Sequence, residues 1–273
     1  MTVTADLSDK TAIVTGASSG IGRAIAERMG AAGAHVVLSG RTADAMEESA
    51  SRITDAGGRA TVVVGDVREP GAVDELISAA MDADGHVDIL VNNAGISFLG
   101  GVLEGDVDQW QSMFDINVIA LLNGTKAAVA AMRSVGNRGH IVNVSSVAAL
   151  RPDSGVYGAT KHAVNVICNS LREELLDDPI QVVSIMPGLV ATNIGRNADP
   201  ELLAGVVAMS GIEAEIVPGE RLPDEVLEAA QAVLSDIMIA PDDVADAVLY
   251  AVTQPAHVHI PEIVIRPNKN FDF

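Results

Sequence analysis

Seven short apolar runs recur along the chain, each rich in Val and Ile. Runs of this kind are typical of strands that are buried on both faces of a sheet. Between them lie segments whose apolar positions recur with helical period. The predicted strands are TAIVTG (11–16), HVVLSG (35–40), TVVVGD (61–66), DILVNN (88–93), HIVNVSS (140–146), QVVSIMPG (181–188) and EIVIRP (262–267). The predicted helices cover residues 20–33, 43–57, 70–84, 106–133, 155–177 and 241–253.

This alternation predicts an α/β fold, with a doubly wound parallel sheet of about seven strands and helices on both faces. No internal repeat or low-complexity linker interrupts it, so we expect a single domain over residues 1–273. Residues 193–240 are an exception, because they separate the last two strands with helical pieces that are interrupted by prolines at 218 and 223. Such an insertion is often a lid, and we interpret it as a helical lid that binds substrate. The alternative is a helical excursion that packs on the domain or on a neighbouring subunit.

Composition narrows the class of function. Because 48% of the 273 residues are hydrophobic, global disorder is excluded. The net charge of -20 argues against nucleic-acid binding, which needs Lys and Arg to neutralise phosphate. No apolar run reaches the length of about 18 residues that a membrane span requires, and MTVTADLSDK does not resemble a signal peptide. With one cysteine, Cys168, we expect a cytoplasmic protein without nucleic-acid or membrane partners.

Polar and small residues gather at the carboxyl ends of the predicted strands. Open parallel sheets bind their ligands outside the carboxyl ends of the strands. We therefore expect these ends to converge on one crevice. They comprise residues 15–22, 40–41, 65–67, 92–95, 145–146 and 187–192.

The first strand end has the pattern of a dinucleotide-binding turn. The sequence TGASSGIG (15–22) follows a strand and opens a helix, with its glycines spaced G-x-x-x-G-x-G. Glycine permits close approach of the backbone to a pyrophosphate, and the helix N-terminus supplies free N–H groups. The GK[ST] ending of a nucleoside-triphosphate loop is lacking, which disfavours a kinase or ATPase. The predicted contacts are Gly16, Ser18, Ser19, Gly20, Ile21 and Gly22.

The end of the second strand predicts which dinucleotide binds. An acidic residue there would bond the adenine ribose hydroxyls and repel a 2′-phosphate, but Gly40 occupies this place and Arg41 follows. Because Arg binds phosphate through a charge-assisted fork, we expect NADP(H) in preference to NAD(H). The alternative is that Arg41 is only a surface residue. The next two strand ends are expected to contribute Asp66, Val67, Asn93, Ala94 and Gly95 to the cofactor site.

A Tyr and a Lys lie four residues apart in YGATK (157–161), just over one helical turn. At alternating intervals of three and four residues, Lys161 is followed by the apolar residues Val164, Cys168, Leu171 and Leu175. Tyr157 and Lys161 therefore extend an apolar stripe, where an unpartnered Lys is unusual. The Lys either reaches past this face to water or takes part in chemistry.

Together these segments resemble the short-chain dehydrogenase/reductase family over nearly the whole chain. Its motif series is matched by TGASSGIG (15–22), NNAG (92–95), Asn117, SS (145–146), YGATK (157–161) and PGLVAT (187–192). The resemblance implies a Rossmann-type fold and assembly as a homodimer or homotetramer. The mechanism needs no metal, and the six histidines do not cluster at ligand spacing. The GR after the second strand and the final IRP are most similar to NADP-dependent 3-hydroxy-acid and clavulanic-acid-type dehydrogenases.

The resemblance also implies which residues do the chemistry. The implied catalytic residues are Asn117, Ser146, Tyr157 and Lys161. Ser146 precedes Tyr157 by 11 residues, an interval shorter than is usual in the family, so Ser145 stays open as the alternative. We place the shortening in the loop VAALRPDSG. The last motif implies cofactor contacts from Pro187, Gly188, Val190 and Thr192.

The implied function is an NADP-dependent oxidoreductase that transfers a hydride between nicotinamide and a secondary alcohol or ketone, or an aldehyde. Tyr157 would be the general acid/base, with its pKa lowered by the Lys161 ammonium. Ser146 would orient the substrate oxygen, and Asn117 would hold a water that links Lys161 to solvent. The alternative is a non-catalytic NADP(H)-binding regulator or scaffold. Apolar substrate contacts are expected from Val206, Val207, Met209, Ile212, Ile216 and Val217.

Overall fold

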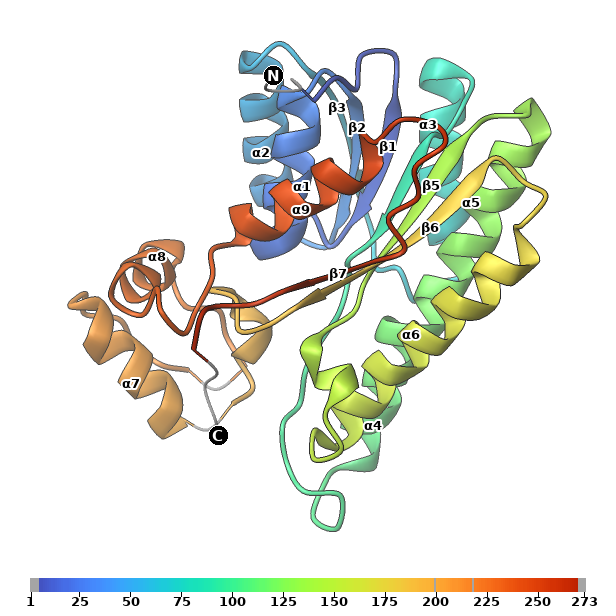
Figure 1. Cartoon of the computed structure of the whole chain (residues 1–273). Helices are drawn as coiled ribbons and strands as arrows, with labels where there is room; N and C mark the ends of the chain where they lie inside the picture. Colours follow the sequence, from blue (N-terminus) through green and yellow to red (C-terminus); the bar gives the residue numbers. More distant parts are fainter. Residues whose placement is uncertain (1–4, 199, 218, 270–273) are drawn as a thin grey trace.

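All seven predicted strands join one parallel sheet in the computed structural model, which describes residues 5–198, 200–217 and 219–269 (Figure 1). The strands are β1 (Thr11–Thr15), β2 (His35–Gly40), β3 (Arg59–Val64), β4 (Ile89–Asn92), β5 (Gly139–Val144), β6 (Ile180–Pro187) and β7 (Glu262–Ile265). Their order in the sheet is β3-β2-β1-β4-β5-β6-β7. Strands β2 and β3 are added on one side of β1 and the last four strands on the other side, so the point where the strand order reverses lies between β1 and β4. A reversal of this kind opens a crevice at the carboxyl ends of the strands.

Helices cover both faces of the sheet, as the sequence predicts (Figure 1). One face carries α1 (Gly20–Ala31), α2 (Ala43–Asp55) and α9 (Pro241–Val252). The other carries α3 (Ala72–Asp84), α4 (Val107–Phe114), the π-helical η1 (Asp115–Ala120), α5 (Leu121–Val135) and α6 (Gly155–Glu174). Short 3-10 turns follow β5 and β6, namely η2 (Val147–Leu150) and η3 (Asn193–Gly195).

The central strands are buried on both faces, which explains their continuous apolar composition. All five residues of β1 are buried. Ala12 and Val14 pack with the helices α1, α2 and α9, whereas Ile13 packs on the opposite face with α3, α5 and α6. Because successive side chains point to opposite faces, a strand in this position needs apolar residues throughout.

The apolar stripe predicted from YGATK onward faces the sheet. Val164 and Cys168 are fully buried, Leu175 is buried and Leu171 packs against the same cluster. This helix surface anchors α6 on the sheet, so that the first turns of α6 lie at the carboxyl end of β5.

The helical stretch Val107–Val135 is long enough and apolar enough to cross a membrane by length and composition alone, and it is the one such stretch among the described residues. Half of its apolar window is buried within the protein. Its buried side chains, including Met113, Ala128 and Met132, pack inside the molecule. We therefore interpret this stretch as a core helix of the fold.

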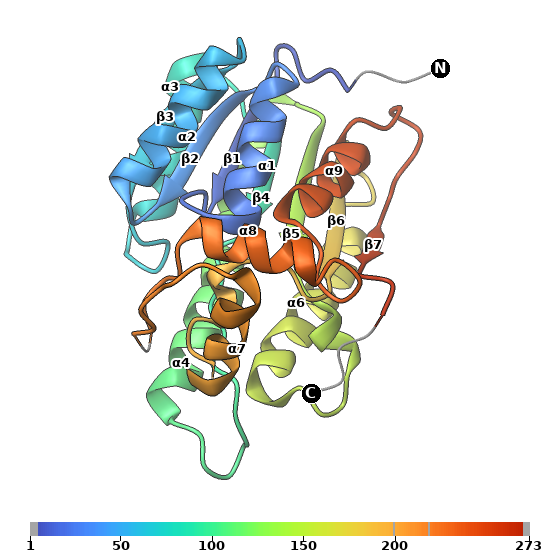
Figure 2. The same cartoon turned by 90° about the vertical axis from the view of Figure 1, so that its left-hand side faces the viewer.

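The segment between β6 and β7 adds α7 (Pro200–Ser210) and α8 (Asp224–Val233). These helices stand beyond the carboxyl ends of the strands, away from the two helical layers (Figures 1 and 2). They have a small core of their own, formed by Leu203, Leu222, Val226 and Leu227.

A buried histidine near the start of β5 makes the stability of this fold depend on pH. His140 is 8% exposed, and its Nε2 atom has no hydrogen-bond partner among the described residues. Burial lowers the pKa of His140 from 6.5 to about 4, and the positive charge of Arg138 adds to this effect. The folded protein therefore holds the imidazole neutral at a pH where the unfolded chain is already protonated.

We expect the free energy of unfolding to fall by about 3 kcal/mol between pH 7 and pH 4 because of His140 alone. The unfolded state binds more protons than the folded state only between the two pKa values, 6.5 and about 4, so the contribution is absent above pH 6.5. Urea unfolding at a series of pH values measures it. His140→Asn should lose this part of the pH dependence, and an unchanged dependence in the variant would contradict the assignment.

Candidate active site

A cleft of about 1770 Å³ lies at the carboxyl ends of the strands, under residues 193–240. This exceeds the range of about 300–1,000 Å³ that is usual for ligand pockets, and it can hold a dinucleotide together with a small second molecule. The predicted site residues that line the cleft are Gly16, Ser18, Ser19, Gly20, Ile21, Arg41, Asp66, Val67, Asn93, Ala94, Gly95, Ser146, Tyr157, Lys161, Pro187, Gly188, Val190 and Thr192. Gly22 and Asn117 lie behind its wall.

The glycine-rich turn requires glycine at three positions, two because of backbone conformation and one because of close packing. Gly16 and Gly20 have positive φ values of 68° and 54°, which favour glycine. A Cβ atom at Gly22 would lie 2.3 Å from the carbonyl oxygen of Gly16. At the start of α1, the N-cap residue Ser19 makes no side-chain cap, so the first N–H groups of the helix are left for a ligand.

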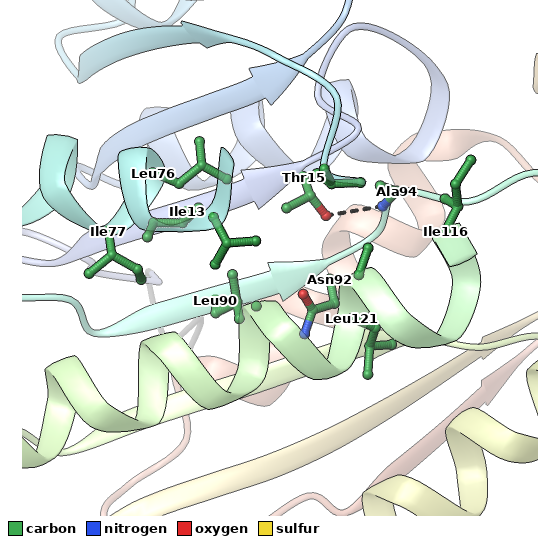
Figure 3. Close-up of a pocket in the computed structure, with 13 residues that line it drawn as sticks. Ile13, Thr15, Leu76, Ile77, Leu90, Asn92, Ala94, Ile116 and Leu121 are labelled. Atoms are coloured by element: carbon green, nitrogen blue, oxygen red, sulfur yellow. Dashed lines mark hydrogen bonds between the residues drawn. The ribbon is translucent and has the colours of Figure 1, made fainter. Parts of the chain in front are cut away.

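A threonine that the sequence analysis did not single out holds this turn against the end of β4. The Thr15 hydroxyl accepts hydrogen bonds from the backbone N–H groups of Asn93 (3.0 Å) and Ala94 (3.1 Å), and donates one to the Val91 carbonyl (3.2 Å). Figure 3 shows the bond to Ala94 beside a small cavity with about 10 Å³ of free volume, enough for about one water. Thr15 is recognisable in sequence only as a polar residue that ends an apolar strand.

A chain of buried polar side chains continues beneath the cleft. The Asn92 amide donates to Thr125 Oγ1 (3.0 Å) and to Asn143 Oδ1 (2.8 Å). Asn143 in turn donates to Cys168 Sγ (3.2 Å). These bonds join α5, β4, β5 and α6 below the reacting groups, and they give Cys168 a structural position.

Lys161 is a buried cation at the floor of the cleft. It is 5% exposed, and its Nζ atom donates a hydrogen bond to the carbonyl oxygen of Val144 at 2.8 Å. The same Nζ atom lies 5.9 Å from the centroid of the Tyr157 ring. The Lys therefore does not reach past the apolar face to water, and the Tyr and Lys of YGATK face the same space.

The two serines at the end of β5 point in different directions. The Ser145 hydroxyl is buried and donates to the carbonyl oxygen of Lys161 (3.1 Å), which leaves it in the protein interior. Ser146 Oγ lies in the cleft within hydrogen-bonding reach of the Tyr157 hydroxyl, and it accepts from the Ala148 N–H (3.1 Å). The geometry therefore favours Ser146 over Ser145 as the partner of Tyr157, in spite of the short loop.

The pKa values of this pair differ from the sequence-based expectation. Burial raises the pKa of Tyr157, and the hydrogen bond with Ser146 offsets only part of this effect. Burial lowers the pKa of Lys161 to about 8. The reason is that both groups are removed from water, which disfavours their charged forms, while the ammonium is bonded to Val144 and not to the phenol. In the protein by itself, Tyr157 is therefore a protonated group at neutral pH.

Asn117 lies in η1, a π-helical turn of the kind that often occurs at functional sites. Its Oδ1 atom accepts from the Ile96 N–H (2.9 Å), and its amide donates to the Ile96 carbonyl (3.0 Å) and to Thr160 Oγ1 (3.1 Å). Both amide hydrogens are thus engaged, and the side chain ties the loop after β4 to α6. The water-holding role of Asn117 stays a prediction. A water could bond the side chain only through Oδ1, because both amide hydrogens are already donated.

At the other end of the cleft, β2 ends in Gly40 and is followed by the exposed Arg41, as the sequence indicates. Asp66 lines the same region, but its carboxylate is already held by Arg68 through bonds of 2.7 and 3.0 Å. These bonds lower the pKa of Asp66, to which Arg41 also contributes. Arg68 escaped the sequence analysis because an exposed Arg two residues after an Asp has no distinctive pattern.

The PGLVAT motif connects the sheet to the segment above the cleft. The Gly188 N–H donates to the Ile265 carbonyl (2.8 Å), and Val190 forms a bridge with Ile239. The Thr192 methyl group would meet a Cβ atom at Gly20 at 3.0 Å, so this motif closes against the glycine-rich turn. The motif thereby fixes where residues 193–240 leave the sheet.

Residues 193–240 cross the open side of the cleft and contact both of its walls. Arg23 of α1 forms a salt bridge with Asp224 at 2.5 Å, and the Asn197 amide donates to the Ser97 carbonyl at 3.1 Å. Of the apolar residues expected to meet substrate, only Val206 lines the cleft. The others pack within the segment (Val207, Ile212, Ile216) or are exposed (Met209, Val217), because two short helices need a core of their own.

A model of the short chain dehydrogenase family matches residues 10–202. The chain belongs to the short-chain dehydrogenase family. This short-chain dehydrogenase is 36% identical over 265 residues to an uncharacterized oxidoreductase of Staphylococcus epidermidis, a match that covers 96% of this chain and 99% of the relative. Oxidoreductase is thus the class of protein that its family and fold both indicate.

Two solved structures share the architecture of this short-chain dehydrogenase. L-Sorbose reductase from Gluconobacter frateurii, complexed with NADPH and L-sorbose, superposes with a TM-score of 0.78 at 27% identity, covering 97% of both chains. The closed form of a serine dehydrogenase complexed with NADP+ superposes with a TM-score of 0.76 at 29% identity, covering 94% of both chains. Both similarities extend through the segment 193–240 rather than stopping at the sheet.

Proposed function

We propose that this short-chain dehydrogenase transfers a hydride between NADP(H) and a secondary alcohol or ketone, or an aldehyde, with Tyr157 as general acid/base. The observation that carries the proposal is the convergence of Tyr157, Ser146 and Lys161 in the cleft that begins at the glycine-rich turn. A carbonyl or alcohol group beside Tyr157 would also contact Ser146. The alternative of a non-catalytic regulator gains no support from this cleft, since the groups needed for proton transfer are in place.

Tyr157, Ser146 and Lys161 each have a distinct role in the proposed reaction. In reduction, the Tyr157 hydroxyl donates its proton to the substrate oxygen, and in oxidation it accepts one. Ser146 Oγ donates a hydrogen bond to the same oxygen and orients it. Lys161, with a pKa of about 8, is mostly charged at neutral pH, and its ammonium favours the phenolate when Tyr157 acts as base. When bound, the nicotinamide supplies or accepts the hydride.

The cofactor preference rests on charge at the end of β2. No carboxylate occupies the place after β2 where the ribose hydroxyls of NAD(H) would be bonded, and Arg41 lines the cleft there. The L-sorbose reductase and the serine dehydrogenase are complexed with NADPH and NADP+, which supports the same cofactor here. We therefore infer NADP(H) in preference to NAD(H).

Several apolar side chains line the walls beside the reacting groups. Ala148 and Leu150 follow Ser146, and Leu189 belongs to the PGLVAT motif, whose Pro187 carbonyl accepts a hydrogen bond from Ser146 (3.5 Å). Across the cleft, Val206 and Met238 come from the segment 193–240. A small alcohol or carbonyl compound with an apolar portion fits these walls, and closure of the segment over it would exclude water.

We also propose that the protein is a homodimer or homotetramer. Large apolar side chains are exposed on the outer surface of η1, α5 and α6, among them Ile119, Leu122 and Val166. Exposed apolar surface of this kind often marks a protein–protein interface. Light scattering after size-exclusion chromatography should give the mass of two or four chains, and the mass of one chain would exclude this assembly.

We expect Tyr157→Phe to reduce turnover by about a hundredfold or more, because the general acid/base is lost. The dissociation constants for NADPH should change little, since the ring remains in the cleft. Titration with NADPH followed by fluorescence, and then steady-state assays with a panel of ketones and aldehydes, measure both quantities. Near-wild-type rates in the variant would show that another group transfers the proton.

Arg41→Ala should weaken NADPH binding by about tenfold or more while NADH binding changes much less, because a charge-assisted bond to the 2′-phosphate is removed. Fluorescence titrations of both nucleotides measure the ratio. Arg52→Ala, on the outer surface of α2, serves as the matched control. Equal losses for both nucleotides would exclude a phosphate clamp at Arg41.

A further inference from the structure

Three arginines from separate parts of the chain meet on the rim of the cleft. Arg41 follows β2, Arg196 follows η3 and Arg221 precedes α8, and all three line the cleft. Within the described ranges of the chain, no salt bridge involves any of them. This is unusual in a protein with 37 acidic and 17 basic residues.

The segment 193–240 is built to present two of these arginines together. The Asn193 amide donates to the Leu222 carbonyl (3.0 Å), and the Leu222 N–H donates back to Asn193 Oδ1 (2.8 Å). The Gly219 N–H donates to the Arg196 carbonyl (3.3 Å). Residues 193–196 and 219–222 therefore lie side by side, and Arg196 and Arg221 belong to one paired unit.

This unit contacts the glycine-rich turn at two points. Thr192, four residues before Arg196, packs against Gly20. Asp224, three residues after Arg221, forms the salt bridge with Arg23 in the first turn of α1. Both arginines are therefore held near the glycine-rich turn, whose Ser18 lies against Gly40 at the end of β2, next to Arg41.

Electrostatics agrees with this placement. Arg196 is partly buried, with one guanidinium nitrogen bonded to the Asn193 carbonyl at 3.0 Å. Burial, and then the positive charges of Arg41 and Arg221, lower the pKa of Arg196. Asp66 also lies near Arg41, but its salt bridge at 2.7 Å is with Arg68. Among the described residues none of the three arginines forms a salt bridge, so the repulsion between them favours binding of an anion among them.

We propose that Arg196 and Arg221 complete, with Arg41, a site for the 2′-phosphate of NADP(H), and that this phosphate holds the segment 193–240 over the cleft. The inference rests on the proposed function, and it identifies residues of the segment 193–240 that would distinguish NADP(H) from NAD(H). A phosphate monoester carries about −1.5 to −2 charges at neutral pH and has three acceptor oxygens, which suits guanidinium groups approaching from two sides. NADH lacks this group and leaves the repulsion among the arginines in place.

The test compares nucleotide affinities in Arg221→Gln and Arg196→Gln. Each variant should raise the dissociation constant for NADPH by about tenfold and that for NADH by less than about twofold. Arg221→Gln is the cleaner change, since the side chain of Arg221 makes no hydrogen bond or ion pair within the described part of the chain. Arg196→Lys keeps the charge and should lose less than Arg196→Gln. Retained NADH affinity shows that each variant is folded.

Arg138→Gln is the matched control, because it removes the same charge from a residue outside the cleft whose guanidinium bonds the Ala256 carbonyl. It should change neither affinity. Hydrogen exchange of residues 193–240 gives a second readout, with more protection by saturating NADPH than by saturating NADH. In Arg221→Gln, the two nucleotides should protect this segment equally.

The outcomes separate this inference from the proposed function. If Arg41→Ala removes the preference for NADPH while both lid variants bind NADPH as the wild type does, the inference is wrong and the cofactor preference stands. If Arg196→Gln and Arg221→Gln lower the affinities for NADPH and NADH equally, these arginines do not bind the 2′-phosphate. That outcome would also overturn the inference. If neither Arg41→Ala nor the lid variants change the ratio, both proposals fail.

Discussion

The candidate site depends on a buried positive charge at the end of β5. An ammonium removed from water is costly unless protein oxygens replace its hydration, and the Val144 carbonyl supplies that contact to Lys161. The bond fixes α6 against β5, so Tyr157 one turn earlier and Ser146 two residues beyond Val144 are placed by the same contact. The buried chain from Asn92 through Asn143 to Cys168 supports this arrangement from below.

The fold was predictable because its signals are local. A strand that is buried on both faces is mainly apolar, and the central residues of β1, β2 and β5 show this directly. The crevice at the strand ends followed from parallel topology alone. The glycine-rich turn was also predictable from the sequence, because a side chain at Gly22 would collide with the Gly16 carbonyl.

Other features could not be read from the sequence because they are set by contacts between distant segments. The bonds of the Asn117 amide to Ile96 and Thr160 tie the loop after β4 to α6, a contact that the sequence did not reveal. The pKa of Tyr157 was expected to fall, yet burial raises it, and the Lys161 ammonium donates its hydrogen bond to the Val144 carbonyl. The apolar residues of the segment 193–240 were expected to face substrate, but most of them pack against the small core of α7 and α8.

The contrast between the net charge of -20 and the arginines on the rim has a kinetic consequence. A polyanionic nucleotide is repelled by the field of the whole protein at long range and is attracted only within the last few ångströms of its path. Salt shortens the reach of that field to about 8 Å at physiological ionic strength, while it weakens close contacts less. Added salt therefore speeds the encounter, the opposite of the usual behaviour for an anion that binds to arginines.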